Sequence, residues 1–137
     1  MIDYKKLINE ALKAREFAYI PYSNFAVGAA LITAGGKIYS GCNIENASFS
    51  PTICAERTAF FKAVSEGERK FKMIAVCGEC NGEGDRPFYP CGVCRQVMAE
   101  FCGPDFIVLV ATADDGYEKF TLSDLLPHTF SIEKGSN

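Results

Sequence analysis

Cysteine content constrains the fold of this sequence more than any other feature. The chain has seven cysteines among 137 residues, in two C-x-x-C pairs and three isolated positions. They are Cys42, Cys54, Cys77, Cys80, Cys91, Cys94 and Cys102. An odd number of thiols, in a sequence that starts without the apolar stretch of a secretory signal, fits a disulfide framework poorly. We therefore expect some thiols to bind a metal ion and others, such as Cys42 and Cys102, to be small buried side chains.

Length and composition predict a single globular domain over residues 1–137. Hydrophobic residues make up 48% of the sequence and charged residues 23%, as in ordinary folded proteins. The net charge of −3 would repel a phosphate backbone, so we expect no nucleic-acid partner. No apolar run approaches the ~20 residues of a membrane span, which predicts a cytoplasmic protein without membrane contact. Residues 132–137 are expected to form a frayed tail.

Hydrophobic spacing predicts helices that alternate with short strands. The predicted helices are 4–18, 53–66, 91–101 and a short turn that Ser123 caps and Pro127 ends. The predicted strands are 25–33, 38–46, 71–76, 106–111 and 117–122, with a loop at 78–90. Gly35-Gly36 predicts a β-hairpin between the first two strands. The pattern indicates a layered α/β domain with a mixed sheet covered on both faces.

Two different zinc sites can be assembled from these cysteines. In the first, Cys77 and Cys80 join Cys91 and Cys94 in a closed four-thiol site, as in a structural zinc ribbon. The ten residues between the two pairs fall short of the ~15–20 usual for such ribbons. In the second, Cys54 joins Cys91 and Cys94, and the fourth position stays open for water, as a catalytic zinc requires.

The residues around the second set of thiols favour a catalytic site. Pro90 is suited to the start of a helix, which would place the Cys91 and Cys94 thiolates near its N-terminal dipole. Glu56 lies two residues after Cys54, close enough to act as a base beside the open position without being a ligand. Three thiolates on Zn²⁺ leave a net charge of −1, and Arg57 is the candidate to offset it from behind the ligands.

These motifs together resemble the zinc-dependent cytidine and deoxycytidylate deaminase family, in its small homotetrameric class. The resemblance rests mainly on two motifs, C-A-E-R at 54–57 and P-C-G-V-C-R-Q at 90–96. They match the variant of the family signature in which Cys replaces His. The likeness also covers Y-S-N-F at 22–25, G-A-A at 28–30, G-C-N-I-E-N-A-S at 41–48 and L-L-P at 125–127. It therefore spans nearly the whole chain.

The resemblance implies a fold and a reaction. The fold is a three-layer α/β/α sandwich around a mixed sheet of about five strands. The reaction is the hydrolytic deamination of cytidine and deoxycytidine to uridine and deoxyuridine plus ammonia, at the C–N bond of a cyclic amidine, in pyrimidine salvage. One zinc per chain is held by Cys54, Cys91 and Cys94; zinc-bound water attacks C4, and Glu56 shuttles the proton. The implied assembly is a homotetramer with shared active sites.

The resemblance also implies substrate contacts. Asn43 and Glu45 match residues that bind the sugar 3′-OH, and their i, i+2 spacing on a predicted strand places both on one face. Phe25 matches a residue that packs on the base, and Ala55 is a further substrate contact. Phe130 matches a residue that reaches into a neighbouring subunit's site.

Two features depart from the family pattern. Phe49 stands where relatives usually have tyrosine, so a hydrogen bond from that phenol is absent. The pair Cys77 and Cys80 and the long loop 81–89 are not part of the signature. A second zinc site, a redox pair and coincidence are the alternatives, and coincidence or loop packing is favoured because a loop rather than a helix follows the pair.

Three other functions compete with the leading hypothesis. The same chemistry could deaminate a cytosine-bearing antibiotic through a changed sugar pocket, although Asn43 and Glu45 favour the ordinary nucleoside. A non-enzymatic zinc ribbon would use the four paired cysteines as an interaction module. Polynucleotide deamination is disfavoured by the acidic net charge and the lack of a basic run.

Overall fold

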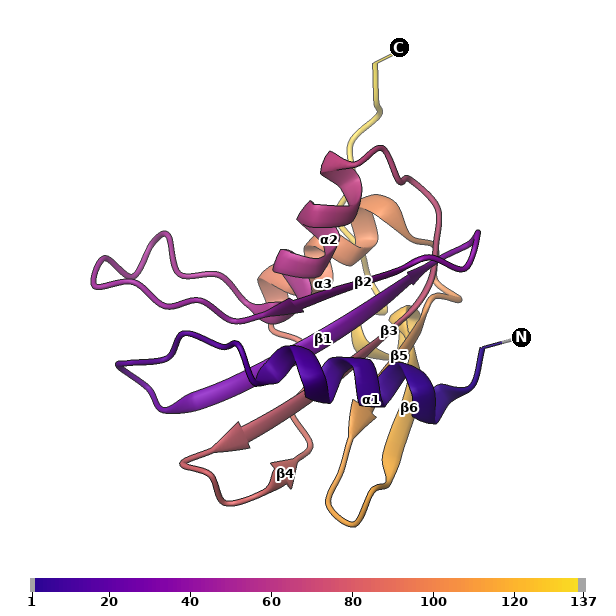
Figure 1. Cartoon of the computed structure of the whole chain (residues 1–137). Coiled ribbons are helices and arrows are strands. Elements are labelled where there is room, and N and C mark those ends of the chain that lie inside the picture. Colours follow the sequence, from indigo (N-terminus) through magenta and orange to yellow (C-terminus); the bar gives the residue numbers. More distant parts are fainter. Residues whose placement is uncertain (1, 136–137) are drawn as a thin grey trace.

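A mixed sheet of six strands forms the centre of the computed structural model, which describes residues 2–135 (Figure 1). The strands are β1 (Phe25–Thr33), β2 (Ile38–Cys42), β3 (Phe71–Cys80), β4 (Asp85–Arg86), β5 (Ile107–Ala111) and β6 (Tyr117–Thr121). Their order is β2-β1-β3-β5-β6, and the two-residue β4 pairs with the end of β3. Only the β3 and β5 pair is parallel, which confirms the predicted mixed sheet.

Helices cover both faces of this sheet. The helix α1 (Tyr4–Arg15) crosses one face, in front of the sheet in Figure 1, and α2 (Ala55–Ser65) and α3 (Gly92–Phe101) lie behind it. A short helix, α4 (Leu122–Leu125), follows β6. This arrangement confirms the expected three-layer α/β/α sandwich. No helix within residues 2–135 combines the length and the apolar character needed to cross a membrane.

The alternation of side chains along β1 divides the interior into two cores. Ala29 and Leu31 point toward α2 and α3, in a cluster that centres on Phe60. Ala30 and Ile32 point to the opposite face and pack beneath α1. Because both faces of β1 are buried, its sequence is an almost unbroken apolar run rather than an alternation of apolar and polar residues.

A glycine on β2 sets how closely α2 approaches the sheet. A Cβ atom at Gly41 would lie 2.6 Å from the carbonyl oxygen of Ala55 and 2.6 Å from the backbone nitrogen of Ala59. No side chain fits there, so the first turns of α2 rest directly on β2. This contact places the N-terminus of α2 at the edge of the cavity described below.

Several predicted boundaries are wrong, each for a local reason. α1 ends at Arg15 rather than at residue 18, because residues 16–18 form tighter turns bonded three residues back. Thr121, not Ser123, caps α4, through a reciprocal pair of hydrogen bonds with Asp124.

Two further differences concern the strands, and one prediction lies partly outside the described chain. β2 ends at Cys42, whereas the strand was predicted to continue to residue 46. β3 runs on to Cys80, because its last residues pair with the start of β1. Of the predicted frayed tail 132–137, residues 132–135 lack regular secondary structure and residues 136–137 lie outside the described range.

Candidate metal centre and substrate pocket

Three thiols from two distant segments converge at the N-termini of α2 and α3. The Sγ atoms of Cys54 and Cys91 are 3.7 Å apart, and those of Cys91 and Cys94 are 3.5 Å apart. All three sulfurs lie within 4.8 Å of one another, and within residues 2–135 this is the one group of Cys, His, Asp or Glu side chains so arranged. The structure therefore brings together the second of the two cysteine sets that the sequence allowed.

Two of these cysteines cap helices, and the pKa of one of them is strongly lowered. Cys54 is the N-cap of α2 and Cys91 is the N-cap of α3, where the Cys91 sulfur accepts a hydrogen bond from the Cys94 backbone at 3.5 Å. Both sulfurs thus lie at the positive ends of helix dipoles. Hydrogen bonds from the Cys94 thiol and then from Arg57 lower the pKa of Cys54 to about 5, against the opposing effect of burial.

The spacing of the sulfurs fits a tetrahedral zinc ion. Zinc–sulfur bonds of about 2.3 Å at tetrahedral angles place pairs of sulfur ligands roughly 3.8 Å apart. The two distances given above are close to that value. Three thiolates fill three corners of the tetrahedron, and a catalytic site needs the fourth corner for water. The donor set and its spacing thus fit one zinc ion per chain.

Cys77 and Cys80 do not take part in this cluster. Both lie within β3, and side chains three residues apart in a strand point to opposite faces of the sheet. Cys77 is buried in the core beneath α1, where burial raises the pKa of its thiol to about 11. The closed four-thiol alternative and the redox pair both require these two sulfurs to meet, and the strand keeps them apart.

Glu56 and Arg57 flank the thiols in the first turn of α2. The Glu56 side chain is buried, with 5% of its surface exposed, and burial raises its pKa to about 7. Arg57 Nη2 donates a hydrogen bond to the Cys54 sulfur at 3.3 Å. The buried Nε of Arg57 has no hydrogen-bond partner in the described part of the chain. A cation is thus held directly behind a cluster of thiols, as a site with excess negative charge requires.

A cavity of about 280 Å³ opens above the thiols. It is lined by Phe25, Val27, Asn43, Glu45, Thr52, Ile53, Cys54, Ala55, Glu56, Val76, Phe88, Tyr89 and Cys91. Five residues predicted as catalytic or substrate-binding are therefore together with two of the three predicted metal ligands. The cavity has an apolar wall of aromatic and aliphatic side chains and a polar side formed by an amide and carboxylates, which suits a planar base attached to a hydroxylated sugar.

Asn43 and Glu45 reach this cavity from the segment after β2, not from within the strand as predicted. The Asn43 amide accepts a hydrogen bond from Val27 N at 2.9 Å and donates one to Phe25 O at 2.8 Å. Glu45 accepts hydrogen bonds from the backbone nitrogens of residues 22 and 23 and from the Ser23 hydroxyl. These bonds, led by the one from the hydroxyl, lower the pKa of Glu45.

Phe130 is a predicted site residue that neither lines the cavity nor belongs to the thiol cluster. Its side chain is 70% exposed, and its carbonyl oxygen accepts a hydrogen bond from the Gln96 amide at 3.1 Å. Phe49, which stands where relatives usually have tyrosine, is 82% exposed.

Phe88 and Tyr89 line the cavity, although the sequence motifs assigned them no role. Their position immediately before Pro90 and Cys91 was the signal that could have indicated them.

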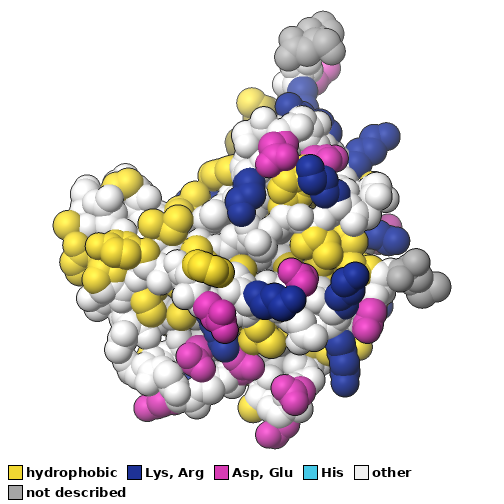
Figure 2. All heavy atoms as spheres, viewed as in Figure 1, with side chains coloured by type: hydrophobic (Ala, Val, Ile, Leu, Met, Phe, Trp, Pro, Cys, Tyr) yellow, Lys and Arg dark blue, Asp and Glu magenta, His cyan; other side chains and the backbone are white. Residues whose placement is uncertain are grey.

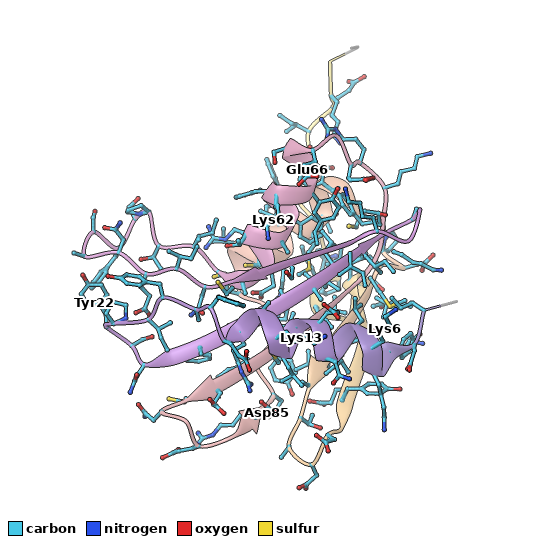
Figure 3. All side chains as sticks on the ribbon, in the orientation of Figure 1. Lys6, Lys13, Tyr22, Lys62, Glu66 and Asp85 are labelled. Atoms are coloured by element: carbon cyan, nitrogen blue, oxygen red, sulfur yellow. The ribbon has the colours of Figure 1, made fainter. Side chains whose placement is uncertain are left out.

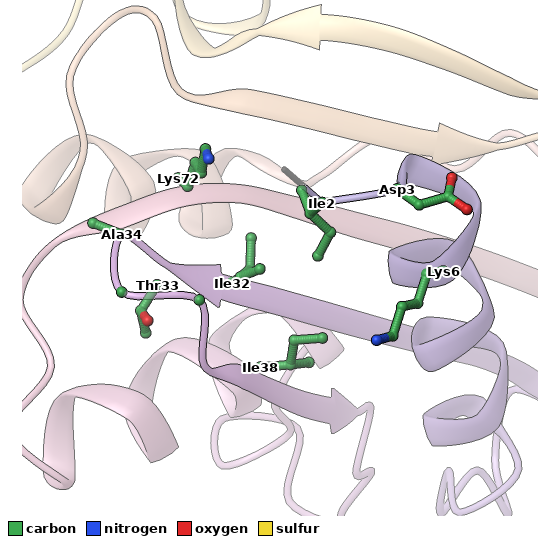
Figure 4. Close-up of a pocket in the computed structure, with 10 residues that line it drawn as sticks. Ile2, Asp3, Lys6, Ile32, Thr33, Ala34, Ile38 and Lys72 are labelled. Atoms are coloured by element: carbon green, nitrogen blue, oxygen red, sulfur yellow. The ribbon is translucent and has the colours of Figure 1, made fainter.

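A second hollow, of about 410 Å³, lies at the opposite end of β1 (Figure 4). Its floor includes Ile32 and Ile38 on the sheet, and Lys6 and Lys72 stand at its edge. Asp3 is the carboxylate there, and it caps α1 by accepting a hydrogen bond from a backbone nitrogen of the first turn. Among the described residues that line this hollow, none is a cysteine or histidine, so it offers no comparable chemistry.

Comparisons with known proteins agree with this geometry. A family model described as the cytidine and deoxycytidylate deaminase zinc-binding region matches residues 1–110. A cytidine deaminase of Sporosarcina psychrophila is 54% identical over 132 residues, covering 96% of this chain and 94% of that protein. A cytidine deaminase of Halalkalibacterium halodurans is 50% identical over 132 residues, covering 96% and 97%. The crystal structure of cytidine deaminase from Burkholderia pseudomallei superposes with a TM-score of 0.86 at 47% identity, covering 94% of this chain and all of that one.

Proposed function

Because this chain belongs to the cytidine and deoxycytidylate deaminase family, we propose that it hydrolyses cytidine and deoxycytidine to uridine and deoxyuridine, with release of ammonia. The observation that supports this most directly is a cluster of three thiols, two of which line the same cavity as a buried carboxylate. The chain is a hydrolase that depends on zinc. We place it in pyrimidine salvage in the cytoplasm, with residues 1–137 as one catalytic domain.

The metal ligands are Cys54, Cys91 and Cys94. When bound, zinc supplies a Lewis acid that makes a water molecule nucleophilic near neutral pH. The chain itself holds Cys54 and Cys91 at two helix N-termini and places Arg57 against the Cys54 sulfur. The ligands come from rigid helix ends rather than from flexible loops, so the geometry is set before the metal binds.

Glu56 is the proton carrier in this proposal. Its carboxylate takes a proton from the attacking water and delivers it to N3 of the cytosine ring as the new C4–O bond forms. Glu56 then takes the second proton of that water from the C4 hydroxyl and passes it to the amine, so that the C4–N bond breaks, the C4 carbonyl forms and ammonia leaves. Glu56 suits this role because it is buried at the cavity wall beside the thiols, where bulk water does not compete for the proton.

Other residues that line the cavity hold the nucleoside. Phe25 packs on the base, Ala55 contacts it from the start of α2, and Asn43 with Glu45 binds the sugar 3′-OH. The hydrogen bonds that Asn43 makes to β1 use one lone pair and one N–H, so a second acceptor position and a second donor remain for a hydroxyl. The same bonds hold the amide in one orientation, which reduces the entropy lost on binding.

Assembly completes the proposal. We infer a homotetramer with shared active sites, because Phe130 is exposed and does not line the cavity of its own chain. Large apolar side chains also gather on one side of the molecule, at the left of Figure 2, where the loops flanking the cavity lie. Tyr22, at the tip of one of these loops in Figure 3, and Phe49 are among the exposed hydrophobic residues. Burial of such side chains in an interface would explain their exposure in a single chain.

Incubation of the purified protein with cytidine tests the whole proposal. We expect stoichiometric release of uridine and ammonia, one zinc per chain, and a solution mass of four chains by light scattering. A protein that binds zinc and cytidine but releases no ammonia would contradict the activity. Faster turnover of a cytosine-bearing antibiotic than of cytidine would instead favour the alternative substrate, and a monomer with full activity would refute the shared sites.

Arg57 gives a separate prediction about the charge of the metal centre. Arg57→Ala is expected to lower both zinc retention and turnover by ~10–100-fold, as loss of a group that supports metal ligands typically does. Metal content after dialysis against a chelator and ammonia release at saturating cytidine measure the two effects. Arg69→Ala, at an exposed arginine bonded to backbone carbonyls, is the matched control. Wild-type values for Arg57→Ala would remove Arg57 from the site.

A further inference from the structure

Phe88 belongs to the loop between β3 and α3, the part of the chain that departs from the family signature. Its side chain lines the cavity beside Phe25, and the two ring centroids are 3.8 Å apart with an interplanar angle of 44°. Phe25 comes from the start of β1, so residues far apart in the sequence form one aromatic wall. Val27 and Val76 continue this wall toward the thiols.

A glycine on β3 makes room for the Phe88 ring. A Cβ atom at Gly78 would lie 1.9 Å from Phe88 Cδ2, so the ring occupies the space of the missing side chain. Gly78 pairs with Val27 of β1. It lies on the same face of β3 as Val76, which lines the cavity. Any larger residue at Gly78 would push the ring out of the wall.

Several contacts hold this loop against the rest of the fold. Gly78 and Glu79 pair with Arg86 and Asp85 of β4, which turns the loop back along β3. Arg15 of α1 forms an ion pair with Asp85, which Figure 3 shows on the hairpin near the C-terminal end of α1. At the other end of the loop, the Tyr89 hydroxyl donates a hydrogen bond to Glu118 Oε1 at 2.8 Å, and its ring packs on Phe120.

These contacts make the position of Phe88 a fixed property of the fold. The hairpin fixes the start of the loop, Tyr89 fixes its end, and Gly78 admits the ring between them. A rigid aromatic ring at a cavity wall can bind a planar base with little loss of conformational entropy. The base is the planar part of the nucleoside, so it is the part that this wall fits.

We propose that Phe88 is a base-binding residue, which together with Phe25 holds the pyrimidine ring in the cavity, and that Gly78 is the positioning residue that admits it. This rests on the proposed function, since the base is that of cytidine. Phe88 has no group that can transfer a proton, so its contribution is to binding. It should therefore affect KM and product affinity rather than kcat.

Steady-state kinetics of Phe88 variants test the proposal. Phe88→Ala is expected to raise KM about tenfold for both cytidine and deoxycytidine, with little change in kcat, as loss of ~1.4 kcal/mol of base stacking would do. The inhibition constant of uridine should rise by the same factor. Phe88→Leu keeps apolar volume but lacks the ring, so it should fold as the wild type does and still show the higher KM. Phe88→Tyr should restore a near-normal KM.

Controls separate this role from a structural one. Arg86→Ala changes a solvent-exposed residue of the same hairpin, paired with Glu83, and should leave KM and kcat unchanged. Zinc per chain and the Tm should be normal in Phe88→Leu and Phe88→Tyr. A wild-type KM and uridine affinity in Phe88→Leu would overturn the base-binding role. Absence of cytidine turnover in the wild-type protein would instead overturn the proposed function, whereas uridine binding measured directly still reports on Phe88.

Discussion

Glu56→Gln is expected to abolish most turnover while leaving zinc in place. Glutamine matches glutamate in size and fits the same buried position, but it cannot take a proton from water or return one to the leaving amine. General acid–base catalysis contributes typically ~10²–10⁴-fold, and in the proposed mechanism one group serves two proton transfers, so the fall in kcat should be at least of that size. Ammonia release with cytidine measures the loss, and metal analysis measures zinc per chain.

The other end of the same helix supplies the control. Glu66→Gln changes the exposed C-cap of α2, which contacts Lys37 and Tyr39 far from the cavity, and it should retain full turnover. Neutral glutamine also removes a buried carboxylate, so Glu56→Gln should not unfold the chain. Turnover of Glu56→Gln within a few-fold of the wild type would show that another group moves the protons.

Cys54→Ala is expected to lose zinc and, with it, all measurable turnover. Two thiols then remain, both from α3, and they cannot enclose the ion from the side of α2. Cys80→Ala is the matched variant, because Cys80 is a half-buried thiol near the same end of the sheet but outside the cluster. It should keep zinc and activity. Metal content per chain and cytidine deamination check both variants.

This pair of variants also decides between an enzyme and a zinc ribbon. A ribbon built from the two C-x-x-C pairs would lose its metal in Cys80→Ala and keep it in Cys54→Ala. Because a structural zinc can contribute ~10–16 kcal/mol to folding, such a ribbon would also unfold when Cys77 and Cys80 are both replaced. These two cysteines lie on opposite faces of β3, so we expect the reverse result. The fold should survive the replacement of both.

Local patterns were sufficient for most of the fold. The strand 25–33 was predicted with the bounds that β1 has, because its apolar run and the Gly35-Gly36 turn are signals contained within a few residues. The core of each larger helix was also predicted correctly. The ends of elements were less accurate, since the end of α1 depends on tight turns that many sequences could form.

The extension of β3 shows what local patterns miss. Residues 78–80 have the glycine and polar content of a loop, yet they form strand because residues 25–27 pair with them. The partner strand lies about fifty residues earlier in the sequence, so no window around Cys77 contains that information. The prediction that a loop begins at residue 78 was wrong for this reason.

The sequence by itself determined the chemistry: the types of metal ligand, the candidate acid two residues after Cys54 and the class of reaction were readable from short motifs. Only the tertiary structure decided which thiols meet, that Asn43 and Glu45 line the cavity from beyond the strand, and that the Phe88 ring lies over Gly78 at the cavity wall. The physical reason is the distance along the sequence over which the residues interact. A motif is set by neighbours along the chain, whereas a cavity is set by strand pairing and close backbone packing between segments that the sequence keeps apart.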